Sequence, residues 1–250
     1  MRLRSLLWIA LLVSNFAQAA IVRVGGSAMV HQNTGSAGTG FTITYTPAAG
    51  NLIVVSVSSG VATGDPLPTA VKDNLNNSLS IVSSVLSADN QRAWVAYEIA
   101  PSGVTSVTAS GSAASTFATY NLTEWSGVAS SSPLDQNHSA TGANPLSTGS
   151  ITNTNANDLN IAVGVSDDAS LTSWDNSANT GWTVEWQTGD SSTGTPGNLL
   201  YQIASGSTGP FSATMNYPPA TSVDVSLIVS FLPAGGAPAR VPSMLLRGIG

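Results

Sequence analysis

The sequence predicts an all-β protein, an antiparallel β-sandwich built from two similar halves. Short apolar or alternating segments recur along the chain, separated by turns rich in Gly, Pro, Ser and Asn, which is typical of many short strands. Beyond residue 19, no segment shows a helical period with capping residues. The most apolar run, residues 51–58, has a counterpart at 157–166, and further matching segments follow both at a spacing of about 105 residues.

The composition supports a folded chain with an uncharged polar surface. Hydrophobic residues make up 42% of the 250 residues and charged residues only 8%, against roughly 25% charged residues in average soluble domains. Disordered chains show the opposite balance, with low hydrophobicity and high net charge. We therefore expect Ser, Thr, Asn and Gly to cover the surface of a well-filled core.

The first 19 residues match a secretory signal peptide. Arg2 and Arg4 form a basic start, residues 6–13 form an apolar stretch, and Ala17-Gln18-Ala19 gives a small-x-small cleavage site. The apolar stretch is far shorter than the roughly 20 residues that span a membrane. We therefore expect a secreted or cell-surface protein, with no membrane span after cleavage.

The chain contains no cysteine, which excludes thiolate metal sites and cysteine nucleophiles. An exported chain without disulfides indicates a bacterial source. Without Arg2 and Arg4, five basic residues remain against thirteen acidic ones. This balance disfavours nucleic acid and anionic lipid as partners, since both require a basic surface.

In the first half, the period of two is clearest where Phe41, Ile43 and Tyr45 alternate with threonines. Residues 51–58 form a continuous apolar run, which is typical of a strand buried on both faces. Residues 60–77, which contain two prolines, are expected to form a long polar loop. The expected strands of this half are residues 21–24, 41–46, 51–58, 79–86, 92–99, 104–109 and 116–125.

In the second half, residues 223–231 alternate most strictly between apolar and polar side chains. The other expected strands are residues 159–165, 181–187, 198–203 and 211–217. Residues 126–149 are rich in Ser, Thr, Asn and Gly and suit either a domain linker or a crossover loop. We favour a crossover loop, because neither half shows enough strands for two well-buried sheets.

The expected organisation is one β-sandwich domain over residues 20–233. Its halves span about 39–128 and 150–233. Residues 234–250, which begin with Gly, Ala and Pro, are expected to form a flexible tail.

Several short motifs resemble those of exported bacterial β-sandwich domains of jelly-roll type. They are Gly50–Val55, Asp73-Asn74, Arg92–Tyr97, Glu124–Val128 followed by Pro133–Asp135, Asn157–Leu159 and Phe231–Pro233. The resemblance covers residues 39–233 and implies a jelly-roll-like sandwich. Domains of this type are largely uncharacterised, and proteins of related architecture bind glycans or mediate surface contacts, so the resemblance specifies a fold and not an activity.

Hydrolytic chemistry finds little support in the sequence. A glycosidase needs two carboxylates beside one bond, and the candidates Glu98, Glu124 and Glu185 lie in expected strands. We expect these three side chains to face solvent, opposite the apolar positions. His31 and His138 fall in expected polar loops without a nucleophile motif, so a catalytic triad is not expected either.

Two loops at equivalent points of the halves concentrate oxygen donors of the kind that calcium prefers. The candidate ligands are Asp73, Asn74 and Asn77 in the first half and Asp175, Asn176 and Asn179 in the second. The same residues suit Asx turns, in which the side chains bond to their own backbone. We favour the turns, and calcium is the cofactor that the sequence leaves open.

Glycan binding would require exposed aromatic rings that stack on sugars. Trp94 lies on the less apolar face of its strand and Trp174 lies in a loop beside Asp175, so these two are the candidate ligand contacts. Trp182 and Trp186 alternate with apolar residues and are expected to belong to the core, as is Trp125.

The sequence therefore predicts a non-catalytic secreted or cell-surface module that binds a carbohydrate or another surface component. The alternative is a structural subunit of an extracellular layer, fibre or matrix. A subunit of that kind would assemble through edge strands, whereas a binding module would stay monomeric and hold a ligand. A glycoside hydrolase is the third interpretation.

Overall fold

The computed structural model describes residues 19–25, 31–34, 40–61, 64–110, 116–166, 173–188, 196–217 and 223–235. These residues form sixteen strands, all paired antiparallel, and no helix, so none of them forms a helix that could cross a membrane. Residues 1–18 of the predicted signal peptide and residues 236–250 of the predicted tail lie outside the described residues. The predicted all-β class is confirmed.

The first half contains a main sheet and a smaller sheet. The main sheet has the order β1-β9-β4-β7-β6, with β2 beside β1 on strand β9. The smaller sheet has the order β3-β8-β5. The strands are β1 (Val22–Val24), β2 (His31–Thr34), β3 (Gly40–Thr44), β4 (Leu52–Val61), β5 (Ala70–Asp73), β6 (Ser80–Ser83), β7 (Gln91–Ile99), β8 (Ser106–Ser110) and β9 (Thr116–Ser126).

The second half repeats this plan. Its main sheet has the order β10-β16-β12-β14-β13, and strands β11 and β15 form the smaller sheet. The strands are β10 (Leu134–Ala143), β11 (Leu146–Ser147), β12 (Leu159–Val165), β13 (Thr183–Thr188), β14 (Gly197–Ile203), β15 (Thr214–Met215) and β16 (Val223–Phe231). In each half the first strand pairs with the last, and intervening strands supply the smaller sheet. Both halves therefore have the same jelly-roll arrangement of strands. The prediction of two similar halves is confirmed.

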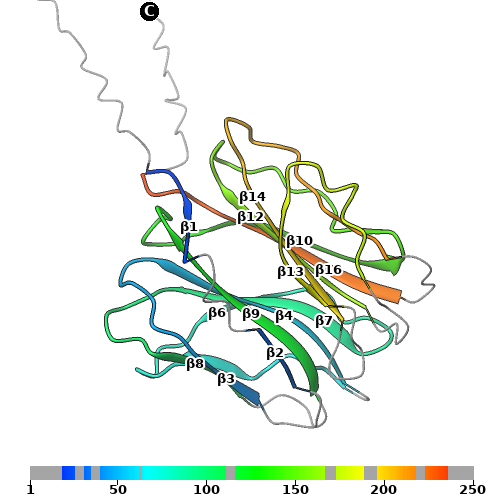
Figure 1. The fold of residues 1–250 in the computed structure, drawn as a ribbon, viewed down its shortest axis with the longest axis horizontal. Coiled ribbons are helices and arrows are strands. Elements are labelled where there is room, and N and C mark those ends of the chain that lie inside the picture. The colour runs from blue at the N-terminus through cyan, green and yellow to red at the C-terminus, as the bar shows by residue number, and fades with distance from the viewer. Residues whose placement is uncertain are drawn as a thin grey trace, which may run out of the picture.

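The four sheets stack in layers, with the two main sheets facing each other in the middle (Figure 1). A central core fills the space between the main sheets, and each smaller sheet closes a further core on the outer face of its own main sheet. Each main sheet is therefore covered on both faces. For this reason every residue of β4 and β12 is buried, and both strands read as continuous apolar runs.

An approximate two-fold axis relates the halves. Strand β4 packs on β12, while β7 packs on β16 and β14 packs on β4. Tyr97 of the first half meets Phe231 of the second edge to face, with ring centroids 5.1 Å apart and an interplanar angle of 68°. Tyr201 of the second half meets Trp125 of the first at 4.9 Å and 68°. The repeated segments in the sequence thus form two equivalent contacts across the central core.

The main sheets approach most closely where small residues meet. The Ser58 hydroxyl on β4 donates a hydrogen bond of 2.8 Å to the Gly164 carbonyl on β12. A Cβ atom at Gly197 on β14 would lie 2.5 Å from the Ser58 hydroxyl oxygen. Glycine at 197 is therefore required for the two halves to pack together.

Several expectations about the strands are wrong. His31 and His138, expected in polar loops, lie in strands β2 and β10. Residues 126–149, expected to link the halves, contain β10 and β11, and the expected loop at 60–77 contains β5. Each half consequently does supply a pair of sheets. Strand β10 escaped detection because it is the edge of its sheet, where polar residues are tolerated on both faces and leave no hydrophobic pattern.

Candidate functional site

The two tryptophans proposed as glycan contacts are buried. Trp94 is 2% exposed, because the smaller sheet of the first half covers the less apolar face of β7, which was expected to be exposed. Its indole N–H donates to the Ser59 hydroxyl at 3.0 Å. Trp174 is 5% exposed and packs edge to face on Tyr217. The premise of exposed rings is therefore wrong for both residues, and neither offers a face to a sugar.

The oxygen-rich loop of the first half folds as an Asx turn. Asp73 Oδ1 accepts hydrogen bonds from the backbone N–H groups of Leu75 and Asn77, and Oδ2 accepts one from the Asn77 side chain. Asn74 Oδ1 accepts from the Thr105 backbone N–H at 2.7 Å. These side chains fasten the turn to itself and to the next strand.

The second loop is built in the same way. Asp175 Oδ1 accepts from the Ser177 backbone N–H at 2.9 Å. Asn176 Oδ1 accepts from the Asn179 side chain, whose own oxygen accepts from the Thr214 backbone N–H. Within the described residues, no group of three His, Cys, Asp or Glu side chains could hold a metal ion together. The hydrogen bonds of both loops are those of the Asx-turn alternative.

The three glutamates considered for hydrolysis do not face solvent as expected. Glu124 is 2% exposed, because the loop between β3 and β4 folds over it. Its carboxylate accepts hydrogen bonds from the Tyr45 hydroxyl, the Ala48 backbone N–H and the Asn51 side chain. Burial and the Glu124 carboxylate raise the pKa of Tyr45 to about 12. Glu124 is thus an anchor for this loop.

Glu98 is half-buried, and its Oε1 atom has no hydrogen-bond partner. Burial and the negative charge of Asp73 raise the pKa of Glu98 to about 7. The folded state therefore binds a proton that the unfolded chain releases near pH 4.5. The stability that protonated Glu98 contributes to the folded state is fully present below about pH 4.5 and is lost as the pH rises through about 7.

We expect Glu98→Gln to reduce this loss of stability between pH 4.5 and 7.5. At pH 7.5 the variant should be more stable than the wild type by about 1 to 3 kcal/mol, with little difference at pH 4.5. Urea denaturation at both pH values measures the change. Asp89→Asn, in an exposed turn, is the control and should retain the wild-type pH dependence. If Glu98→Gln were equally stabilising at both pH values, the loss of stability with rising pH would not come from Glu98.

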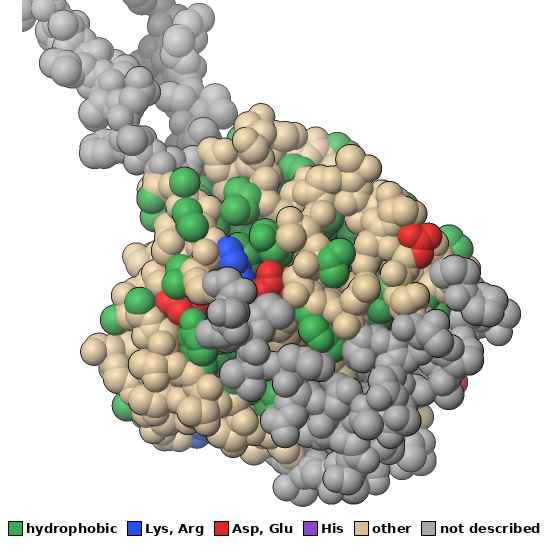
Figure 2. Space-filling model, viewed as in Figure 1, with side chains coloured by type: hydrophobic (Ala, Val, Ile, Leu, Met, Phe, Trp, Pro, Cys, Tyr) green, Lys and Arg blue, Asp and Glu red, His purple; other side chains and the backbone are tan. Residues whose placement is uncertain are grey.

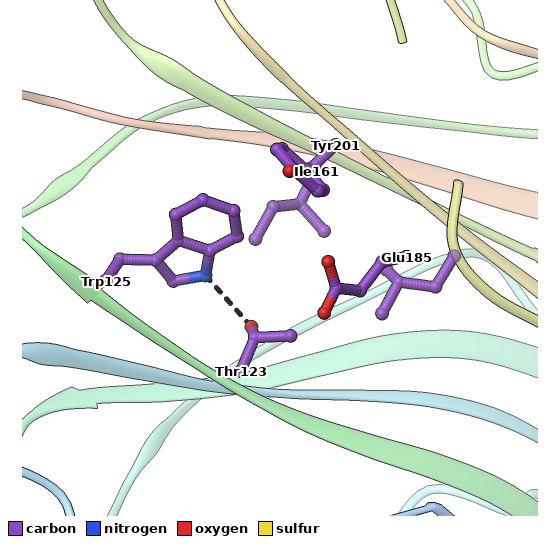
Figure 3. A pocket seen from close by; sticks show the side chains of 6 residues that line it. Thr123, Trp125, Ile161, Glu185 and Tyr201 are labelled. Atoms are coloured by element: carbon purple, nitrogen blue, oxygen red, sulfur yellow. Dashed lines mark hydrogen bonds between the residues drawn. The ribbon is translucent and has the colours of Figure 1, made fainter. Parts of the chain in front are cut away.

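A small pocket lies between the two main sheets, and its lining residues come from both halves (Figure 3). Its empty space of about 150 Å³ includes open solvent at the mouth, and the pocket encloses no room for a water-sized sphere. The first half supplies part of the wall and the second half supplies the rest. The lining residues are Thr123, Trp125, Ile161, Glu185, Leu199 and Tyr201.

An ion pair joins the halves at this pocket. Nε and Nη2 of Arg23 on β1 donate to Glu185 Oε1 on β13, at 3.1 and 2.7 Å. The two side chains are only 14% and 11% exposed. The guanidinium also lies over the Trp125 ring, 5.4 Å from its centroid. Figure 2 shows basic and acidic atoms meeting near the middle of a face that is otherwise largely uncharged.

A β-bulge places Glu185 in the pocket. Val184 pairs with Leu200 and Trp186 with Leu199, so Glu185 is an extra residue between them. Bulges redirect side chains in this way and are frequent beside functional sites. The Glu185 carboxylate points toward Trp125 and Thr123 (Figure 3). Within the described residues, Glu185 Oε2 and the Tyr201 hydroxyl make no hydrogen bond.

The equivalent position on the other side of the two-fold axis is apolar. Leu134 pairs with Phe231 where Arg23 pairs with Trp125. Val229 stands where Thr123 stands, and β6 pairs with β7 in continuous register, without an inserted residue corresponding to Glu185. The two halves thus contain one polar and one apolar version of the same contact.

Comparisons of the chain with protein-family models, with curated proteins and with solved structures found no match. The site itself must therefore indicate the function. The sequence offered Glu185 only as a hydrolytic candidate and gave no reason to single out Arg23, Thr123 or Tyr201. The available signal was the difference between Thr123-Glu-Trp125 and Val229-Ser-Phe231 in otherwise matching segments.

Proposed function

We propose that the protein is a non-catalytic secreted or cell-surface module that holds a carbohydrate, or another hydroxyl-rich surface component, at the Arg23–Glu185 pocket. The observation that supports this proposal is the asymmetry between the two equivalent contacts. Arg23, Thr123 and Glu185 occupy one of them, whereas Leu134 and Val229 occupy the other.

The apolar contact indicates that packing of the halves does not require the polar one. Removing two charges from water is costly, and a buried ion pair is often no more stabilising than apolar residues of similar volume. Arg23 and Glu185 are nearly buried in the folded protein. A polar set in this position is therefore better explained by ligand binding than by folding.

The chemistry of the pocket suits a neutral ligand with hydroxyl groups. Glu185 Oε2 can accept a hydrogen bond, and the Tyr201 hydroxyl can donate or accept one. Tyr201, which is half-buried, adds an aromatic wall, whereas Trp125 lines the pocket but is 0% exposed and offers no face to a sugar. The pocket encloses no room for a water-sized sphere, in contrast to typical small-molecule sites of roughly 300 Å³ or more, so a sugar would lie against its mouth rather than enter it.

Binding of the purified protein to a glycan and polysaccharide array tests the proposal. We expect selective binding by the wild type and at least a tenfold loss of affinity in Glu185→Gln, since the free carboxylate oxygen is removed. Leu134→Met, at the apolar equivalent contact, is the matched control and should bind normally. No binding by the wild type, or equal binding by all three proteins, would overturn the proposal.

A structural subunit is the second candidate, and strand β10 supports it. This ten-residue strand forms the margin of the second main sheet and, among the residues that the structure describes, pairs within that sheet only with β16. Its sequence has no Lys or Pro, the residues that commonly protect edge strands from pairing. Sedimentation of the purified wild-type protein over a range of concentrations distinguishes the two candidate functions. A structural subunit would assemble as the concentration rises, whereas a binding module would remain monomeric.

A further inference from the structure

Two aspartates meet on the outer face of the second main sheet. Asp135 lies near the start of β10, and Asp158 immediately precedes β12. Their carboxyl groups face each other within hydrogen-bonding range. Asp158 is fully buried, with 0% exposure, while Asp135 is half-buried and opens the pair to solvent. Two carboxylates in this arrangement repel each other unless a positive charge or a proton lies between them.

Several oxygen atoms at this place lack hydrogen-bond donors. Neither carboxyl oxygen of Asp158 accepts a hydrogen bond of normal geometry, although buried polar groups in folded proteins are nearly always paired. Burial and Asp135 raise the pKa of Asp158 to about 8, and the nearby Asn155 backbone N–H partly offsets this rise. Asn153, 3% exposed, donates its side-chain N–H to Asn160 Oδ1 at 3.0 Å, which leaves its own Oδ1 atom unpartnered. Three buried acceptor atoms thus remain on two side chains of the segment before β12.

The segment that carries Asn153 also fixes Asp135. The backbone N–H of Thr154 donates to Asp135 Oδ2, and the Thr154 hydroxyl donates to Oδ1, both at 2.7 Å. Asp135 is therefore held in one orientation beside Asp158 before any ligand arrives. Oδ1 also accepts a longer bond of 3.5 Å from the Gln136 side chain, whereas Oδ2 retains a second lone pair for a further contact.

We infer that Asp135, Asp158 and Asn153 form a cation site that takes a hard divalent ion of the size of calcium. All the available atoms are oxygens, and calcium accepts carboxylate, amide and water oxygens in flexible geometry. The charge of the ion balances both carboxylates. Entry is from the solvent side of Asp135, where water completes the coordination shell.

This site is distinct from the turns at Asp73 and Asp175. In those turns the carboxylate oxygens already accept hydrogen bonds from backbone or amide N–H groups, whereas neither oxygen of Asp158 accepts a hydrogen bond of normal geometry. A bound ion would tie the edge strand β10 to the segment that leads into β12. It would therefore stabilise the second half without contacting the Arg23–Glu185 pocket.

Thermal unfolding of the full chain in CaCl₂ and in EDTA tests the inference. Calcium at about 100 times its dissociation constant should raise the Tm of the wild type by roughly 5 to 10 °C. Asp158→Asn should abolish this rise, and Asp135→Asn should reduce it. Asp175→Asn is the matched control, because its oxygen can still accept from the Ser177 backbone N–H, and it should retain the full rise.

Isothermal titration with CaCl₂ supplies a second readout, with one ion expected per chain and loss of the heat signal in Asp158→Asn. This readout does not depend on how much either substitution changes the stability of the fold. Absence of calcium binding by the wild type would overturn the inference. A response that survives in Asp158→Asn but disappears in Asp175→Asn would also overturn it and place the ion in the turn.

Discussion

Replacing Trp94 by alanine is expected to lower the free energy of unfolding by about 3 to 5 kcal/mol. The ring lies between the first main sheet and its smaller sheet, and it stacks near Phe41 with centroids 6.1 Å apart. Its removal would leave a cavity in a closed core and would also leave the Ser59 hydroxyl without the indole donor. Urea denaturation measures the loss directly.

Val85→Ala is the control for Trp94→Ala, because Val85 is 52% exposed and its truncation should change stability by no more than about 0.5 kcal/mol. The same Trp94→Ala protein should bind glycans normally if it is assayed under conditions where it remains folded. Unchanged stability together with lost glycan binding would restore the original ligand-contact hypothesis for Trp94.

Glu124→Ala is expected to destabilise the fold by about 3 to 5 kcal/mol. The change removes the acceptor of three donors, the Tyr45 hydroxyl, the Ala48 backbone N–H and the Asn51 side chain. Because Glu124 is 2% exposed, water cannot readily replace the carboxylate. Denaturant unfolding and hydrogen exchange of the Ala48 amide measure the effect.

Glu124→Gln separates the loss of the charge from the loss of the acceptor. Its amide oxygen can still accept from Ala48 or Asn51, so we expect a loss smaller than that of Glu124→Ala. If both variants were as stable as the wild type, Glu124 would not anchor the loop and its burial would need another explanation.

The fold class and the duplication could be predicted because they depend on local patterns. The alternation of residues 223–231 and the apolar run at 51–58 both correspond to strands of the main sheets. The edge strand β10 could not be predicted from these patterns. Its exposed residues, such as Asn137 and Thr141, carry the composition of a loop.

The candidate site could not be predicted because it depends on contacts between the halves. Alternation assigns a side chain to one face of a strand, but it does not say which faces a second sheet covers. Trp94 was misassigned for this reason. Glu185 enters the pocket through a bulge, which breaks the period of two on which the assignment relied. Arg23 lies 162 residues away from its partner.

The duplication offers a more informative signal than either half alone. Positions that match between the halves, such as Tyr97 and Tyr201, form the same contact twice. Positions that differ, such as Arg23 and Leu134, identify where one copy departs from what packing requires. A comparison of the two copies residue by residue therefore separates structural positions from candidate binding positions.

The most direct test of the proposed binding site is the double variant Arg23→Leu/Glu185→Met, assayed for stability and glycan binding together. The site as described predicts a stability that is unchanged or raised by about 1 to 4 kcal/mol, because the variant resembles the apolar contact at Leu134. It also predicts loss of binding. A protein destabilised by more than about 2 kcal/mol, with wild-type glycan binding, would show that the ion pair serves folding and would contradict the proposed function.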